Sequence, residues 1–362
     1  MSSQVLYRKY RPQTFGEIKG QNHVVQTLKG ALELNRVAHA YLFCGPRGTG
    51  KTTIARLFAK ALNCEKRKDH EPCNVCSACQ AINENRSIDI IEIDGASNRG
   101  IDEIRNIKDI ARVSASQNKY KIFIIDEVHS LTKDAFNALL KTLEEPPEHV
   151  KFILATTEPH KLLSTVISRV QRFDFRKIQH SEIIEKLTEI GVKEKIKIDE
   201  DVLRAVAVNC EGSLRDAESN LAKLISLCGT KITMEDAKDL LGFIPFDFFT
   251  RFMEILIGKQ KDEGIKLVNE LYESGVDLEN FINNFLDFSR KIIIAKVSHD
   301  TAKDFRDELT PEQITQIKKL AETIDTKNII KIIQTFMALR QEIKTSPIPQ
   351  LPLELAVMEL ST

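Results

Sequence analysis

The clearest chemical pattern in the sequence is a glycine-rich run of eight residues, Gly45-Pro46-Arg47-Gly48-Thr49-Gly50-Lys51-Thr52. It fits the spacing G-x-x-x-x-G-K-[ST], and an apolar run precedes it while an apolar helical pattern follows it. In that setting glycines let the backbone wrap around phosphate groups, and amides at the helix start point to anionic oxygens. The run predicts a nucleotide site formed by all eight residues. A plain glycine-rich turn before a helix is the alternative.

Two carboxylates follow a second apolar run, Ile122 to Ile125, and complete a hydrolytic set. We expect Lys51 to neutralise charge on the β- and γ-phosphates, and Thr52 and Asp126 to hold Mg²⁺. Glu127 is positioned in the sequence to accept a hydrogen bond from water and orient it towards the γ-phosphorus. An acidic pair at a strand end can also be a solvated edge. With the glycine-rich run present, the pattern favours ATP hydrolysis over binding alone.

Four cysteines, Cys64, Cys73, Cys76 and Cys79, fall within sixteen residues. Four soft ligands on a compact loop suit a structural Zn²⁺. An iron–sulfur cluster or free thiols are the alternatives, although the Cys-x3-Cys-Pro continuation of ferredoxins is missing. The other three cysteines are isolated in apolar contexts typical of buried residues. An odd number of cysteines without a signal sequence argues against a disulfide framework.

Composition limits the classes of protein that fit. Fifty-two Lys and Arg balance fifty-two Asp and Glu, so the chain as a whole is not a basic nucleic-acid binder, although a local patch remains open. No apolar run approaches the roughly 20 residues of a membrane helix, and the N-terminus lacks the apolar core of a signal peptide. We therefore expect a soluble cytoplasmic protein without membrane partners.

The order of predicted elements indicates an α/β fold followed by helices. Strand-like runs alternate with helical patterns in the first half, which is typical of a parallel sheet with helices on both faces. The strand-like runs are 40–43, 88–93, 121–125, 152–155 and 173–175. After about residue 178 we see only amphipathic helices, separated by glycines. The predicted domains are an α/β domain at 1–178, a small helical domain at 179–243 and a larger helical domain at 244–362.

The sequence resembles AAA+ clamp-loader ATPase subunits over its whole length, most closely the gamma/tau family of bacterial DNA polymerase III. The glycine-rich run and Asp126-Glu127 contribute to this resemblance. Further matching segments are Tyr10-Arg11-Pro12, Phe15, Gly20-Gln21, Phe136 to Val150 with its Leu143-Glu144-Glu145-Pro146-Pro147, Ala155-Thr156-Thr157 and Ser168-Arg169. The resemblance implies an α/β P-loop AAA+ domain with a zinc module at 64–79, a helical lid and a C-terminal helical oligomerisation collar.

The resemblance also implies an activity and partners. Subunits of this family sit in a pentameric ring that uses ATP to open the sliding clamp, and hydrolysis releases the clamp on primed DNA. The implied partners are delta and delta-prime type subunits, further copies of the chain, the clamp and primed DNA. A longer tau form would add contacts to the polymerase core. The implied location is the cytoplasmic, nucleoid-associated replisome. No polymerase active-site motif is visible in this chain.

Four further site assignments come from the resemblance alone. Thr157, with Thr156 beside it, looks like the sensor of the γ-phosphate or the water. Arg169 resembles the arginine finger that reaches a neighbouring subunit's ATP, although the family's Ser-Arg-Cys here ends in Val170. An exposed helix-end arginine is its plainer interpretation. Arg215 resembles the second sensor, and Tyr10-Arg11-Pro12 resembles the strip that covers adenine.

A local DNA contact is predicted before residues 101–110. Arg99 and Arg105 lie at the start of a helical pattern, where amides and guanidinium groups can bind phosphate oxygens. The resemblance favours this region, and Arg105 matches better than Arg99. A solvated helix face accounts for the same residues equally well.

Two other functions share parts of these patterns. A DNA translocase would carry the same nucleotide motifs, but no winged-helix or helix-turn-helix pattern is found near the C-terminus. A non-catalytic delta-prime type scaffold would lack a working nucleotide site, and Lys51, Thr52 and Glu127 argue against that.

Overall fold

The computed structural model describes residues 5–84, 86–298, 300–301, 305 and 308–361. The chain forms two compact units, one of Met1–Ile190 with Cys210–Ala222 and one of Gly191–Asn209 with Lys223–Thr362. The boundaries at 178 and 243 stay a prediction. Within the described ranges, no helix combines the length and apolar character that a membrane span requires.

The first unit is built around a parallel sheet of five strands. Their order across the sheet is β2-β3-β4-β1-β5. Cys44 on β1 pairs with Thr156 on β4, and Asp94 on β2 pairs with Asp126 on β3. All five strands therefore end at one edge of the sheet. Their bounds confirm the predicted strands to within a few residues: β1 (Ala40–Cys44), β2 (Ile90–Asp94), β3 (Lys121–Asp126), β4 (Val150–Thr156) and β5 (Gln171–Asp174).

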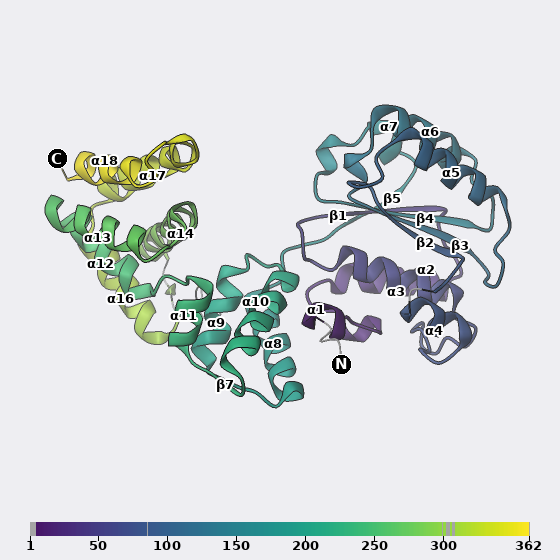
Figure 1. Ribbon diagram of the computed structural model, residues 1–362, viewed down its shortest axis with the longest axis horizontal. Coiled ribbons are helices and arrows are strands. Elements are labelled where there is room, and N and C mark those ends of the chain that lie inside the picture. The colour runs from purple at the N-terminus through teal and green to yellow at the C-terminus, as the bar shows by residue number, and fades with distance from the viewer. Residues whose placement is uncertain (1–4, 85, 299, 302–304, 306–307, 362) are drawn as a thin grey trace. The chain divides into compact units, whose positions relative to one another are not determined.

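Helices cover both faces of this sheet, as the alternating pattern predicts (Figure 1). Residues on β1 alternate between two hydrophobic cores: Tyr41 and Phe43 pack with α2 and α3, whereas Leu42 packs with α5, α6 and α7. The helices are α2 (Asn22–Glu33), α3 (Lys51–Asn63), α5 (Ile101–Arg112), α6 (Lys133–Glu144) and α7 (Ser164–Ile167). Shorter elements of the same unit are α1 (Leu6–Lys9), η1 (Phe15–Glu17), α4 (Ser77–Asn83), η2 (Val128–Ser130) and η3 (Pro159–Lys161).

The helices that follow residue 178 are divided between the two units. Helix α8 (His180–Glu194) up to Ile190 and helix α10 (Leu214–Cys228) up to Ala222 belong to the first. Helices α9 (Glu200–Asn209) and α11 (Met234–Leu241) belong to the second. Two short strands, β6 (Lys197–Ile198) and β7 (Lys231–Ile232), pair in parallel where we expected helices only. Strands of two residues are too short to produce a periodic pattern in the sequence.

The remaining helices of the second unit share one core rich in phenylalanine. Phe252, Phe285 and Phe336 come from three different helices, and the rings of Phe285 and Phe336 lie 4.6 Å apart between centroids. Capping residues define helix starts, as where Thr310 and Gln313 form a capping box. The helices are α12 (Phe246–Ile257), α13 (Lys261–Glu273), α14 (Leu278–Val297), α16 (Pro311–Thr323), α17 (Thr326–Thr345) and α18 (Leu351–Leu360).

Helix α10 buries a carboxyl group in the first unit. Glu218 is 6% exposed, and burial raises its pKa to about 7, although nearby Lys186 and Arg11 act in the opposite direction. Above pH 4.5 the unfolded chain gives up a proton that the folded chain keeps until about pH 7. The stability of the fold must therefore decrease as pH rises through this window.

A Glu218→Gln variant, which mimics the protonated carboxyl, should unfold at a higher temperature than the unmodified protein at pH 8. The gain should be on the order of 2 kcal/mol and should vanish below about pH 4, where Glu218 is protonated in both the folded and the unfolded chain. Thermal unfolding followed by circular dichroism at several pH values measures it. The exposed Glu33→Gln variant is the control, and an equal gain in both variants would contradict the assignment.

Candidate nucleotide and metal sites

The glycine-rich run forms a loop between β1 and α3 whose backbone requires glycine at two points. Gly45 has φ 148° and Gly48 has φ 76°, which side chains other than glycine rarely adopt. A Cβ atom on Gly48 would lie 1.8 Å from Ser213 Oγ, and one on Gly45 would lie 2.5 Å from the Phe175 carbonyl oxygen. The loop is therefore confined between α3 and neighbouring segments, with its amides grouped at the start of the helix.

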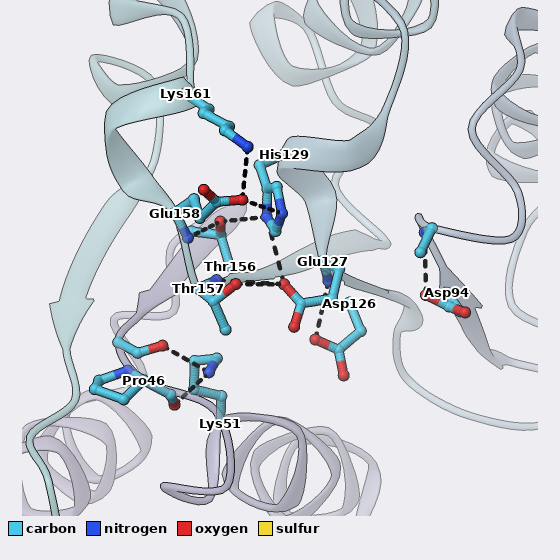
Figure 2. Close-up of polar contacts among 12 residues, drawn as sticks. Pro46, Lys51, Asp94, Asp126, Glu127, His129, Thr156, Thr157, Glu158 and Lys161 are labelled. Atoms are coloured by element: carbon cyan, nitrogen blue, oxygen red, sulfur yellow. Dashed lines mark hydrogen bonds and ion pairs between the residues drawn. The ribbon is translucent and has the colours of Figure 1, made fainter. Parts of the chain in front are cut away.

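Lys51 lies across the inside of this loop. Its Nζ donates hydrogen bonds of 2.8 Å to the carbonyl oxygens of Gly45 and Pro46 (Figure 2). The side chain is 6% exposed, and burial lowers the pKa of Lys51, while Glu127 and Asp126 oppose that effect. A buried ammonium group with only two carbonyl partners remains able to bind an anion.

Thr52 and Asp126 meet at the end of β3. The Thr52 hydroxyl donates a hydrogen bond of 2.6 Å to Asp126 Oδ2, and Asp126 Oδ1 accepts one of 2.9 Å from the Glu127 amide. A hydroxyl and a carboxylate beside a phosphate loop are the oxygen ligands that Mg²⁺ takes. The residues present therefore fit the predicted magnesium site.

Glu127 is held next to the end of β4. Its Oε2 accepts hydrogen bonds from the Thr157 hydroxyl at 3.0 Å and the Thr157 amide at 3.3 Å (Figure 2). Glu127 itself has φ 45°, an uncommon conformation for a residue with a side chain. The structure thus brings Thr157 and Glu127 together, two residues that lie 30 positions apart in the sequence.

The structure adds His129 and Glu158, which sequence reasoning missed. His129 Nδ1 lies 2.9 Å from the Thr156 hydroxyl and 3.4 Å from Glu127 Oε2, and its Nε2 lies 3.0 Å from Glu158 Oε2. Lys161 donates a hydrogen bond of 2.8 Å to Glu158 (Figure 2). Because the His129 ring lies between the carboxylates of Glu127 and Glu158, it restricts the orientation of the Glu127 side chain. The sequence feature that could have revealed His129 is its position two residues after Glu127.

Helix α10 begins directly against the phosphate loop. The Leu214 amide donates a hydrogen bond of 3.1 Å to the Gly48 carbonyl, and Ser213 caps the helix by accepting from the Asp216 amide. The Arg215 guanidinium lies 5.0 Å from the centre of the Tyr7 ring.

Tyr10, Arg11 and Pro12 are half-buried, and burial lowers the pKa of Arg11. Their contact with adenine stays a prediction.

Arg169 is bound to its own chain away from this cluster. Its guanidinium lies 2.9 Å from Glu144 Oε1 and donates a hydrogen bond to the Thr165 carbonyl, beside a surface cavity of about 620 Å³. Among the residues that the structure describes, no hydrogen bond or ion pair joins Arg169 to the phosphate loop or to Asp126 and Glu127. The nucleotide site of one chain is therefore built without it.

The four clustered cysteines converge on one point. Their Sγ atoms all lie within 4.8 Å of one another, and Cys73 Sγ is 3.9 Å from Cys79 Sγ. A tetrahedral ion with Zn–S bonds of about 2.3 Å requires sulfur atoms about 3.8 Å apart. Backbone amides donate to these sulfurs, among them those of Cys73 and Cys76, as expected around thiolates. The cluster fits a single zinc ion.

The residues predicted to contact DNA lie on α5 and just before it. Arg99 is exposed before α5, and Arg105 is exposed on α5, where it forms an ion pair of 3.1 Å with Asp102. Carboxylates of Asp102, Glu103 and Asp109 share this helix. The contact with DNA stays a prediction.

A Lys51→Ala variant should lose at least about a hundredfold in ATP affinity, because it removes the cation inside the loop. The fold should persist, since Lys51 Nζ bonds only to the loop itself. Titration calorimetry with ATP, alongside circular dichroism, measures both. Lys141→Ala, an exposed lysine on α6, is the matched control. Unchanged affinity in Lys51→Ala would refute the site.

Two family models match this chain. The first, described as DNA polymerase III, delta subunit, matches residues 20–179. The second, described as DNA polymerase III subunits gamma and tau domain III, matches residues 232–362. Between them they cover most of both units.

Whole-length relatives agree with these matches. The chain is 37% identical over 360 residues to the DNA polymerase III subunit gamma of Buchnera aphidicola, with 99% of each chain covered. It is 41% identical over 361 residues to the DNA polymerase III subunit tau of Bacillus subtilis, of which it spans 63%. Among solved structures, the Thermotoga maritima RuvB Holliday junction branch migration motor gives a TM-score of 0.48 at 20% identity, covering 76% of this chain and 87% of that one.

The motifs, the strand order of the sheet and the full-length sequence identity all indicate the same fold and family. The fold is the α/β P-loop AAA+ fold with a cysteine module, followed by helices, that the sequence predicts. The chain belongs to the gamma/tau family of DNA polymerase III subunits.

Proposed function

We propose that this chain is an ATP-hydrolysing subunit of a DNA polymerase III clamp loader, which uses ATP binding to open the sliding clamp and hydrolysis to release it on primed DNA. The observation that carries the proposal is the convergence of Lys51, Thr52, Asp126, Glu127 and Thr157 in a member of the gamma/tau family. A replication role of this kind belongs in the bacterial cytoplasm.

The chain's own residues divide the work of binding ATP. Loop amides at the start of α3 hold the phosphates, and Lys51 exchanges its carbonyl partners for β- and γ-phosphate oxygens. Thr52 and Asp126 hold Mg²⁺, which neutralises charge on the phosphates when bound. Arg215, at the start of the helix that contacts Gly48, reaches the γ-phosphate from α10.

Glu127 supports hydrolysis by orienting water. Its carboxylate is already fixed through Oε2 by Thr157 and His129, which leaves Oε1 to accept a proton of the attacking water. Thr157 also lies next to the γ-phosphate, so its bond to Glu127 links occupancy of the site to the position of the base. Thr156 supports this arrangement through His129.

A Glu127→Gln variant should bind ATP as tightly as the unmodified protein and hydrolyse it at least about a hundredfold more slowly, because only proton acceptance is lost. Quenched-flow hydrolysis and equilibrium binding separate the two effects. Glu145→Gln, at an exposed glutamate just after α6, is the control. Equal loss of binding and hydrolysis in Glu127→Gln would make Glu127 a structural residue.

The missing cation at this site comes from a second subunit in our proposal. Arg169 is half-exposed and bound to Glu144, so a neighbouring chain can reach it when the ion pair opens. A guanidinium supplied from outside stabilises charge on the transferring phosphoryl group.

The proposed ring contains further copies of this chain together with subunits of the delta and delta-prime types. Residues 244–362 form its collar. Arg99 and Arg105 hold the DNA backbone, and a longer tau form contacts the polymerase core.

An Arg169→Ala subunit should keep its own ATP affinity but slow hydrolysis next door by about a thousandfold. Rings that mix it with Lys51→Ala subunits test this, because each subunit then lacks half of one site. Only interfaces with an intact Lys51 site and an intact Arg169 should hydrolyse ATP. Full activity in rings containing only Arg169→Ala would refute action in trans.

The same assay tests the overall function. ATP hydrolysis in the assembled complex should rise when clamp and primed DNA are added together, and DNA alone should have a smaller effect. Full stimulation by DNA without the clamp would instead indicate a translocating motor.

A further inference from the structure

A buried lysine joins the cysteine module to the start of the chain. Lys60, on α3, is 2% exposed, and its Nζ donates to three side-chain oxygens. They belong to Gln13 at 2.9 Å, Asn74 at 2.6 Å and Asn83 at 2.9 Å. Asn74 lies in the cysteine loop (residues 64–79), Asn83 ends α4, and Gln13 belongs to the N-terminal segment (residues 11–17).

Glu71 makes a second connection from the cysteine loop to the same segment. Its carboxylate accepts hydrogen bonds from the amides of Phe15 at 2.6 Å and Gly16 at 3.2 Å. It also pairs with Lys29 on α2 at 2.6 Å. In addition, Asn74 Nδ2 donates to the Gln13 carbonyl at 3.2 Å. Every one of these bonds ends on the N-terminal segment or on the helices beneath it.

The residues that precede the N-terminal segment in the chain contact the part of the molecule next to the phosphate loop. Within this segment Arg11 is half-buried, and its carbonyl oxygen accepts a hydrogen bond of 3.1 Å from Gln13 Nε2. Farther along, the Tyr7 ring meets the guanidinium of Arg215 on α10. Helix α10 in turn bonds to Gly48 through its first amide. The backbone from Gln13 back to Tyr7 therefore joins a segment held by the cysteine loop to a ring that contacts α10, the helix bonded to Gly48.

We propose that the metal-loaded cysteine module is a positioning device for nucleotide binding, with Lys60 and Glu71 transmitting its order to the N-terminal segment. Bound metal keeps the cysteine loop folded, and the loop keeps residues 11–17 against α3. These residues keep Arg11 and Pro12 at the adenine, which ATP and ADP share, and keep Tyr7 against Arg215. This inference rests on the proposed zinc and ATP sites and adds a coupling between them.

The negative charge of a metal-loaded cysteine module would compensate the positive charge of the buried Lys60 side chain. One Zn²⁺ with four thiolates carries a net charge of about −2. A buried charge of this kind requires a nearby counter-charge, and a buried ammonium group requires the same in return. The metal-loaded module and Lys60 meet both needs, while the three amide oxygens around Nζ satisfy its hydrogen bonds. When the metal is lost the thiolates take up protons, which removes this anionic partner and leaves Glu17 as the acidic group acting on Lys60.

Coupling between two binding sites is reciprocal. If zinc tightens nucleotide binding by some factor, nucleotide must tighten zinc binding by the same factor. Couplings between sites are typically fivefold or more. This reciprocity gives a measurement on the unmodified protein that does not depend on hydrolysis.

The first experiment measures both affinities of the unmodified chain. Zinc content is determined by metal analysis, and zinc retention is measured against a chromophoric chelator with and without ADP. ADP affinity is measured for zinc-loaded and zinc-depleted protein. We expect about fivefold tighter zinc retention with ADP and an equal gain in ADP affinity with zinc. Binding of both ligands without any mutual effect would overturn the coupling alone, whereas failure to bind ADP or zinc would overturn the proposed sites as well.

The second experiment separates positioning from simple structural support. Glu71→Gln leaves the cysteines intact but removes the acceptor for one amide and the charge that pairs with Lys29. It should keep one zinc per chain, bind ADP about fivefold more weakly and lose the mutual effect of zinc and ADP. Glu65→Gln is the matched control from the same loop, since Glu65 bonds to Ser77 and not to the N-terminal segment. Unchanged ADP affinity and coupling in zinc-loaded Glu71→Gln would overturn the proposal.

Discussion

In a parallel sheet every strand ends at the same edge, and the pairing of Cys44 with Thr156 fixes where β1 and β4 end. The phosphate loop leaves β1 at that point, Asp126 and Glu127 leave the adjacent end of β3, and Thr157 leaves β4. A shift of one residue in this register would turn the apolar side chains of each strand towards the wrong helices. The packing of two hydrophobic cores thus holds the chemical groups in place.

Helix α3 carries a buried ammonium group near each end, and the two serve different anions. Lys51 faces the phosphate loop, and Lys60 faces the cysteine module nine positions later. Because both sites include residues of the same helix, a displacement of α3 at one site also moves the residues of the other site. This shared helix gives the proposed coupling a second, direct route between the metal module and the phosphate loop. The N-terminal segment strengthens the connection by lying along the same helix.

The nucleotide site of a single chain is strong in binding groups and poor in groups that stabilise a reaction. Lys51, Thr52 and Asp126 gather around the phosphate position, but Arg169 is neutralised by Glu144 on its own chain. In the function proposed above, such a site holds nucleotide until a neighbouring subunit adds positive charge, and slow hydrolysis in the isolated subunit would keep the clamp open until then.

The helices, the strands and the local chemistry could be predicted from the amino-acid sequence, because they depend on residues close together in the chain. The G-x-x-x-x-G-K-[ST] spacing, the apolar strands and the Cys-x2-Cys pattern all predicted features that the structure contains. Three contacts could not be predicted in this way: Thr157 donates to Glu127, His129 lies between two carboxylates, and Glu71 accepts from the Phe15 amide. These contacts join residues that are distant in the sequence or follow an irregular turn. They arise from strand order and packing, which no local pattern of residues records.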